Sequence, residues 1–209
     1  MKFYHGTQKQ SLAVLNPFFS TQNTIKKSVI YLTPNAELAL FYIWNRPYKW
    51  VTFEENEDGR VVYTEWYENQ LYEFYKQVSG SVYECDGDNP DIYLTHVKGV
   101  YNSEKPITPV KERVIPNVYE SILEAEKKGN IVIKKYATLS PEEKETIEEN
   151  TIRAIHMQKV LLPEGENRNA EYTEFVKQKF PVAWEKASKM TKEEIETMIN
   201  KWRASRGQH

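Results

Sequence analysis

The stretch Lys2-Phe3-Tyr4-His5-Gly6-Thr7 starts with residues that favour a β-strand and ends on glycine and threonine. We expect a strand over Lys2–His5. The run Ser28–Thr33 contains several β-branched residues and predicts a second strand. The pair Thr33-Pro34 fits a helix N-cap followed by proline at the first helical position, so we expect a helix over Ala36–Trp44.

Composition and charge exclude several classes of protein. The chain has 209 residues, with 28 Lys plus Arg against 30 Asp plus Glu, so its net charge is −2. This near-neutral charge argues against a general nucleic-acid binder. One cysteine, Cys85, rules out a disulfide framework and a cysteine-based zinc site. The longest apolar run, Leu38–Trp44, is too short for a membrane span, and the N-terminus lacks a signal-peptide core, so we expect a cytoplasmic protein.

The character of the sequence changes near Ala137. Before that point, short runs rich in Val, Ile, Tyr and Thr are separated by turn residues, and Asp58-Gly59 lies between two such runs as in a β-hairpin. After it, segments rich in Glu and Lys have helical spacing, and Ser140-Pro141-Glu142-Glu143 matches a capping box. The sequence therefore predicts an α+β domain at residues 1–137 and a helical C-terminal segment at residues 138–209.

Three short pieces carry the residues best suited to chemistry. His5 and Gly6 lie at the end of the first predicted strand, Tyr31 lies near the end of the second, and Tyr42 lies in the predicted helix. Two aromatic rings placed in this way can face each other across a flat ligand and stack on it. The pattern indicates a pocket for a planar ring.

These residues resemble a known family. Tyr4-His5-Gly6-Thr7, followed by Tyr31-Leu32-Thr33 and by Tyr42 at a similar spacing, resembles the ADP-ribosyltransferase fold of the His-Tyr-acid type. Diphtheria-like toxins, poly(ADP-ribose) polymerases and small rifamycin-modifying transferases share that pattern, and Tyr101-Asn102-Ser103 is similar to a segment of the last group. The resemblance covers residues 1–136. It implies a split β-sheet core and NAD-dependent ADP-ribosyl transfer, with NAD as a substrate and no metal.

The resemblance also implies roles for single residues, and the chemistry explains their types. Cleavage of the nicotinamide–ribose bond passes through an oxocarbenium-like state, as in glycoside hydrolysis. His5 would bind ribose hydroxyls through a ring nitrogen. Gly6 would bind the nicotinamide amide through its backbone, because it has no side chain to keep the ligand away. Tyr31 and Tyr42 would stack on the ring, and Thr7 would complete the NAD site.

The catalytic acid is less clearly marked. Alternation along the predicted strand Ile107–Val114 places Glu112 on one face with Val110 and Val114, which we expect to be apolar. Burying a carboxylate on such a face costs free energy unless it has a function or a partner, so Glu112 is the first candidate. Four other acids remain open, three in an acidic loop and one just before it: Asp86, Asp88, Asp91 and Glu84.

Other functions stay open at this stage. The acceptor of ADP-ribose is expected to be a protein or a small molecule rather than a nucleic acid. The fold could instead serve as a non-catalytic binding module, with the helical segment as the surface for a protein partner. A transferase acting on phosphorylated RNA fits less well, because phosphate contacts dominate such binding and the chain is slightly acidic.

Overall fold

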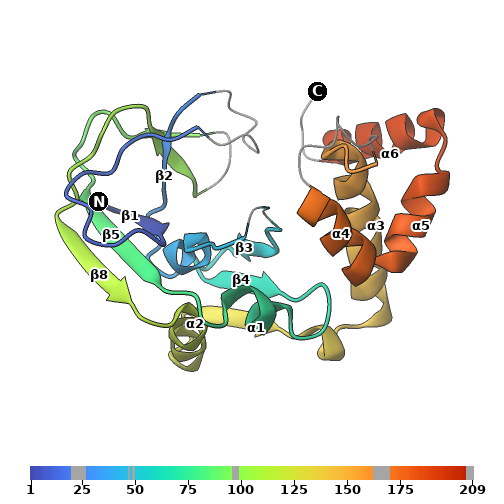
Figure 1. The fold of residues 1–209 in the computed structure, drawn as a ribbon, viewed down its shortest axis with the longest axis horizontal. Coiled ribbons are helices and arrows are strands. Elements are labelled where there is room, and N and C mark those ends of the chain that lie inside the picture. The colour runs from blue at the N-terminus through green and yellow to red at the C-terminus, as the bar shows by residue number, and fades with distance from the viewer. Residues whose placement is uncertain (20–26, 47, 49, 96–98, 162–169, 206–209) are drawn as a thin grey trace. The chain divides into compact units, whose positions relative to one another are not determined.

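The computed structural model describes residues 1–19, 27–46, 48, 50–95, 99–161 and 170–205 (Figure 1). The chain forms two compact units, Met1–Lys135 and Tyr136–His209. The first unit mixes strands and helices, so the α+β class predicted from the sequence is confirmed.

Three small sheets build the described part of the first unit. The largest is antiparallel and has the order β1-β5-β8, with β1 at Lys2–Thr7, β5 at Gly80–Asp86 and β8 at Lys111–Ile115 (Figure 1). The second has the order β2-β7-β6, with β2 at Ile30–Leu32, β7 at Tyr101–Ser103 and β6 at Tyr93–Leu94. The third has the order β3-β4-β9, with β3 at Phe53–Glu55, β4 at Val61–Thr64 and β9 at Ile131–Lys134.

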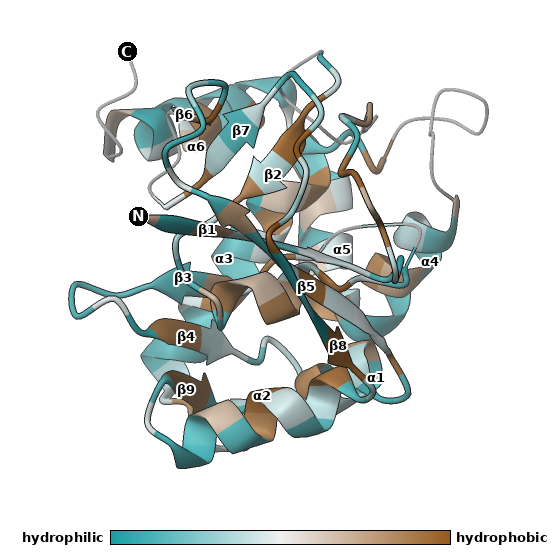
Figure 2. Cartoon of the chain, turned by 90° about the vertical axis from the view of Figure 1, so that its left-hand side faces the viewer, coloured by the Kyte–Doolittle hydropathy of each residue, from teal (hydrophilic) through white to brown (hydrophobic). Residues whose placement is uncertain are grey.

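The third sheet contains the hairpin that the sequence predicted. Strands β3 and β4 pair antiparallel around Asp58-Gly59, and Gly59 has φ 78°, a left-handed conformation that glycine adopts without strain. The turn is hydrophilic (Figure 2). Strand β9 closes this sheet and runs parallel to β4.

Short helices complete the first unit. They are the 3₁₀-helix η1 at Leu38–Tyr42, α1 at Gln70–Tyr75 and α2 at Val118–Lys127. Asn117 caps α2 by accepting a hydrogen bond from the Glu120 N–H. The prediction of a helix over Ala36–Trp44 with Thr33 as its N-cap was wrong in the type of helix and in its first residue. The Asn35 side chain accepts from the N–H groups of Glu37 and Leu38, and only one short 3₁₀ segment follows.

The first two sheets enclose an apolar core. Its buried members come from strands and from the segments between them: Phe3, Leu15, Ile30, Leu32, Tyr83, Cys85 and Ile107. A separate aromatic cluster surrounds η1, in which Phe41 stacks on Tyr63 with ring centroids 5.4 Å apart. Buried Tyr75 donates its hydroxyl hydrogen to the Phe41 carbonyl at 3.0 Å. Tyr75, one of the 14 tyrosines of the chain, is therefore a core residue whose hydroxyl is satisfied inside the protein.

The second unit is helical. It contains α3 at Pro141–Met157, α4 at Ala170–Lys179, α5 at Pro181–Lys189 and α6 at Lys192–Ser205. The capping box predicted at the start of α3 is confirmed, because Ser140 and Glu143 exchange side chain–backbone hydrogen bonds. Among the residues that the structure describes, no helix is long and apolar enough to cross a bilayer.

Candidate functional site

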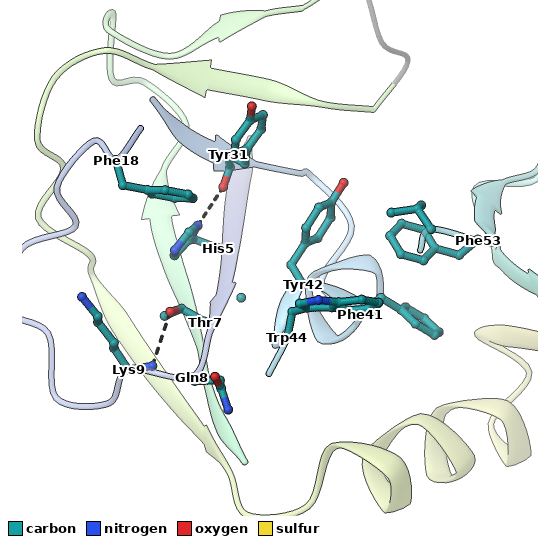
Figure 3. A pocket seen from close by; sticks show the side chains of 12 residues that line it. His5, Thr7, Gln8, Lys9, Phe18, Tyr31, Phe41, Tyr42, Trp44 and Phe53 are labelled. Carbon is teal, nitrogen blue, oxygen red and sulfur yellow. Dashed lines mark hydrogen bonds between the residues drawn. The ribbon is translucent and has the colours of Figure 1, made fainter. Parts of the chain in front are cut away.

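A cavity of about 310 Å³ opens beside the C-terminal end of β1 (Figure 3). Six aromatic side chains dominate its lining, together with the chain that continues from β1. The lining residues are His5, Gly6, Thr7, Gln8, Lys9, Phe18, Tyr31, Phe41, Tyr42, Trp44, Val51 and Phe53. The five residues that the sequence singled out for NAD binding thus line one pocket, while their roles toward NAD stay predictions.

The pocket lies where two strands part. Tyr4 and Thr33 exchange two backbone hydrogen bonds, of 2.7 and 3.0 Å, and join β1 to the chain after β2. A continued antiparallel register would next pair Gly6 with Tyr31. Instead, the Tyr31 carbonyl accepts a hydrogen bond from the His5 side chain at 2.8 Å (Figure 3). The imidazole of His5 therefore replaces the backbone hydrogen bond that Gly6 would donate to Tyr31 in a continued pair of strands.

The parting of the strands leaves the Gly6 peptide groups on an open edge. Backbone groups of alternate residues point to the same side of a strand, so the Gly6 N–H and C=O point as those of Tyr4 do, away from β5. None of the backbone hydrogen bonds outside the helices and strands of the described residues uses either group. The register therefore turns a donor and an acceptor of Gly6, a buried residue that lines the pocket, to the side of β1 that faces away from β5.

Gly6 is required sterically as well. A Cβ atom at this position would lie 1.9 Å from the backbone oxygen of Ala39 and 3.3 Å from the Ile43 side chain. The 3₁₀-helix η1 packs directly against β1 because the side chain is missing. Gly6 therefore holds Tyr42, at the end of η1, close to the strand end.

The ionisation of His5 follows from its place in the pocket wall. Because a carbonyl oxygen can only accept, Nδ1 carries the hydrogen that is donated to Tyr31, and Nε2 of the neutral ring is an acceptor. Burial lowers the pKa of His5, and the hydrogen bond to the Tyr31 carbonyl opposes this shift only in part. At neutral pH the ring is uncharged and can accept a hydrogen bond from a ligand hydroxyl.

The lowered pKa of His5 predicts a pH dependence of stability. Between the folded-state pKa and the ordinary value of 6.5, the unfolded chain binds more protons than the folded chain, so the free energy of unfolding falls as the pH drops below about 6.5. In a His5→Asn variant, which can still donate to Tyr31, this part of the acid sensitivity should disappear. Urea unfolding of both proteins between pH 5 and 7.5 measures the difference. Parallel curves over that range would contradict the prediction.

Tyr31 and Tyr42 stand on different elements, β2 and η1, and both line the cavity (Figure 3). Phe18 packs edge-on against Tyr31 with ring centroids 6.2 Å apart, and Phe53 packs edge-on against Tyr42 at 5.7 Å. Burial raises the pKa of Tyr42 to about 12, so its phenol stays neutral. The two rings are held by aromatic neighbours, as the walls of a stacking site need to be.

The proposed acids lie elsewhere. Among the residues that the structure describes, no Asp or Glu lines the pocket. Glu84 forms an ion pair with Lys2 at 2.6 Å, Asp91 forms one with Lys105 at 2.8 Å, and Asp86 accepts from the Asp88 N–H at 3.1 Å. The first candidate, Glu112, is on β8 and also lies outside the lining.

The expectation that Glu112 shares an apolar face was wrong. Strand β8 starts only at Lys111, and the side chains of Val110 and Val114 are 63% and 54% exposed. Glu112 is half-buried and bound by polar groups, so the cost of burying an unpaired carboxylate does not arise there.

Several pocket residues were not predicted from the sequence. Phe18, Trp44 and Phe53 reach the cavity from three segments, and Lys9 follows β1. Only Phe53 carried a usable signal, since Val51 and Phe53 are two residues apart in a strand-like run and so share a face.

Metal chemistry gains no support from this arrangement. Within the described part of the chain, no three His, Cys, Asp or Glu side chains lie together as a metal site requires. His156, on α3, belongs to the helical unit, and His96 lies outside the described residues.

Comparisons with known proteins add no assignment. No protein-family model, no curated protein and no solved structure matches this chain. The function must therefore be argued from the geometry and chemistry of the pocket.

Proposed function

We propose that the pocket binds NAD by its nicotinamide end and that the chain cleaves the nicotinamide–ribose bond, transferring ADP-ribose to an acceptor. One observation carries this proposal. The Gly6 N–H and C=O lie on an open strand edge in the wall of a pocket whose aromatic side chains include Tyr31 and Tyr42. A primary carboxamide on a flat ring matches both features, because its oxygen accepts, its NH₂ donates and its ring stacks.

The size and charge of the pocket fit one end of a dinucleotide. A cavity of about 310 Å³ is at the small end of the range for ligand sites, which suits a ring with an attached sugar rather than the whole of NAD. Lys9 is exposed and lines the pocket, so its ammonium lies at the rim (Figure 3). An ammonium at the rim favours a ligand whose remaining part is anionic, such as a diphosphate.

The chemistry proposed for the site uses His5 and the two tyrosines. The nicotinamide–ribose bond breaks as positive charge develops on the ribose, and the electron pair of that bond neutralises the departing pyridinium ring. Nε2 of neutral His5 accepts a hydrogen bond from a ribose hydroxyl and so orients the sugar. The stacked rings hold the leaving group, and the acceptor oxygen or nitrogen attacks the ribose carbon and releases its proton to water. The acceptor is a protein or a small molecule in this proposal.

A second function is favoured by a specific observation. The described residues of the lining include no carboxylate that could stabilise the developing positive charge or orient an acceptor. A pocket of this kind would bind NAD without cleaving it. The chain would then act as a ligand-binding module, and the helical unit would be the surface for a protein partner.

Two measurements on the purified full chain test these functions. We expect NAD and nicotinamide to bind with a dissociation constant at or below about 1 mM, the upper end of ordinary substrate constants. Titration by calorimetry measures binding, and chromatography of released nicotinamide measures cleavage. Binding with release supports the transferase, and binding without release supports the module. If neither ligand binds at millimolar concentration, both proposals are wrong.

A further inference from the structure

Glu112 fastens three parts of the first unit together. Its Oε1 accepts hydrogen bonds from the Ser81 hydroxyl at 2.6 Å, from the Ser11 N–H at 2.9 Å and from the Tyr83 hydroxyl at 3.0 Å. Ser81 and Tyr83 belong to β5, and Ser11 belongs to the turn that follows β1. One carboxylate oxygen therefore ties β8 to β5 and to this turn.

The same turn has further bonds to β5. The Leu12 N–H donates to the Tyr83 hydroxyl at 3.0 Å, and that hydroxyl lies 3.1 Å from the Lys9 carbonyl oxygen. The Gln10 side chain donates to the Gly80 carbonyl at 3.3 Å. Ser11 has φ 56°, a left-handed conformation that is strained for a residue with a side chain. The charged acceptor on its N–H helps to hold it there.

This turn reaches the candidate site. Gln8 and Lys9, which lead from β1 into the turn, line the pocket. Glu112 does not line it, and the strand register explains why. His5 is opposite Tyr83 on β5, and Tyr83 is opposite Glu112 on β8. Two strand spacings, roughly 10 Å, thus separate the backbones of His5 and Glu112.

We infer that Glu112 is a positioning residue: its carboxylate fixes the turn after β1, and thereby the pocket wall made by Gln8 and Lys9, without touching the ligand. The ligand part of this inference rests on the proposed function, whereas the fastening of the turn does not. The three donors also lower the pKa of Glu112, with the Ser81 hydroxyl making the largest contribution, so the group stays an ionised acceptor and is no proton donor at neutral pH.

A catalytic acid and a positioning residue respond differently to conservative replacement. Glutamine keeps an oxygen that can accept from Ser11 and Ser81, but it has no charge and cannot exchange a proton. Alanine has no acceptor in its side chain, so the Ser11 N–H loses this hydrogen bond. A positioning role therefore predicts a much smaller loss for Glu112→Gln than for Glu112→Ala, and a catalytic role predicts that both variants lose turnover alike.

The experiment compares Glu112→Gln, Glu112→Ala and the exposed control Glu57→Gln with the wild-type chain. Amide hydrogen exchange at Ser11 and Leu12 reads the fastening directly and needs no ligand. We expect exchange at both amides to become at least about tenfold faster in Glu112→Ala and to change less in Glu112→Gln. The dissociation constant for NAD should rise by about tenfold in Glu112→Ala and should rise less in Glu112→Gln.

Two results would overturn the inference. If Glu112→Gln binds NAD as the wild type does but releases no nicotinamide, while the wild type releases it, Glu112 is the catalytic acid and the proposed function stands. If neither variant changes exchange at Ser11 and Leu12, the carboxylate does not fasten the turn. If the wild type binds no NAD, the proposed function fails, and the exchange data alone decide the role of Glu112.

Discussion

Replacing Gly6 by alanine should lower the free energy of unfolding by about 3 kcal/mol or more, the upper end of the cost of overpacking, and should abolish NAD binding. The new Cβ would lie 1.9 Å from the Ala39 carbonyl oxygen, so β1 and η1 would have to move apart. The Ala39 oxygen belongs to the backbone of η1, so no change of side-chain rotamer can relieve this clash. The movement would also displace Tyr42 and the open peptide edge of Gly6.

Gly59→Ala is the matched control for this prediction. Gly59 has φ 78° in the hairpin turn, and a Cβ there would meet nothing within 4 Å. Its replacement should cost only about 1–2 kcal/mol, from the left-handed backbone conformation, and should leave binding unchanged. Urea unfolding gives both costs, and calorimetry gives binding. A Gly6→Ala protein that is as stable as Gly59→Ala and still binds NAD would show that β1 and η1 are not in tight contact.

Removing the Tyr31 ring should weaken NAD binding by about 5- to 150-fold, which corresponds to the roughly 1–3 kcal/mol of a base–aromatic stack. Tyr31→Ala is the simplest variant, because that side chain is only half-buried. Tyr42 is more deeply enclosed, and Tyr42→Leu removes the aromatic face while it keeps an apolar side chain in contact with Phe53. Both variants should lower the affinity for nicotinamide as well as for NAD.

Tyr72→Ala controls for the general loss of a tyrosine. Tyr72 is 42% exposed on α1 and packs against Tyr119, away from the pocket lining. Its variant should bind NAD as the wild type does. Thermal unfolding of all three variants separates loss of binding from loss of the fold. Unchanged affinity in folded Tyr31→Ala and Tyr42→Leu would mean that the ligand ring does not lie between the two tyrosines.

The sequence predicted those parts of the fold whose signals are local. The Asp58-Gly59 hairpin and the Ser140 capping box depend on residues within one turn of each other, and both are present. The helix after β2 was mispredicted, because Asn35 competes for the cap and the segment buries Leu38 to Phe41 as a tight 3₁₀ turn. Core packing decided that element, and packing is not visible in a local pattern.

The candidate site was predictable only in part, for the same reason. His5 and Gly6 are adjacent in sequence, and Tyr31 is at a strand end, so a joint pattern could mark them. Phe18 reaches the pocket through tertiary folding alone. The face of Glu112 could not be predicted either, because the alternation of β8 does not reveal which side of an edge strand meets solvent.

The opening between β1 and β2 links ligand recognition to folding. Backbone hydrogen bonds join Tyr4 to Thr33, the His5 side chain donates to the Tyr31 carbonyl at the next position of the ladder, and the register turns the Gly6 peptide groups away from β5. A carboxamide has the same donor and acceptor as a peptide group, so such a ligand would complete the ladder as a substitute for a strand residue. A carboxylic acid would turn an acceptor toward the Gly6 carbonyl and be repelled. The pocket would thus distinguish an amide from its acid in the way that strands pair, by matching each donor with an acceptor. A bound ligand would also add to the stability of the native state.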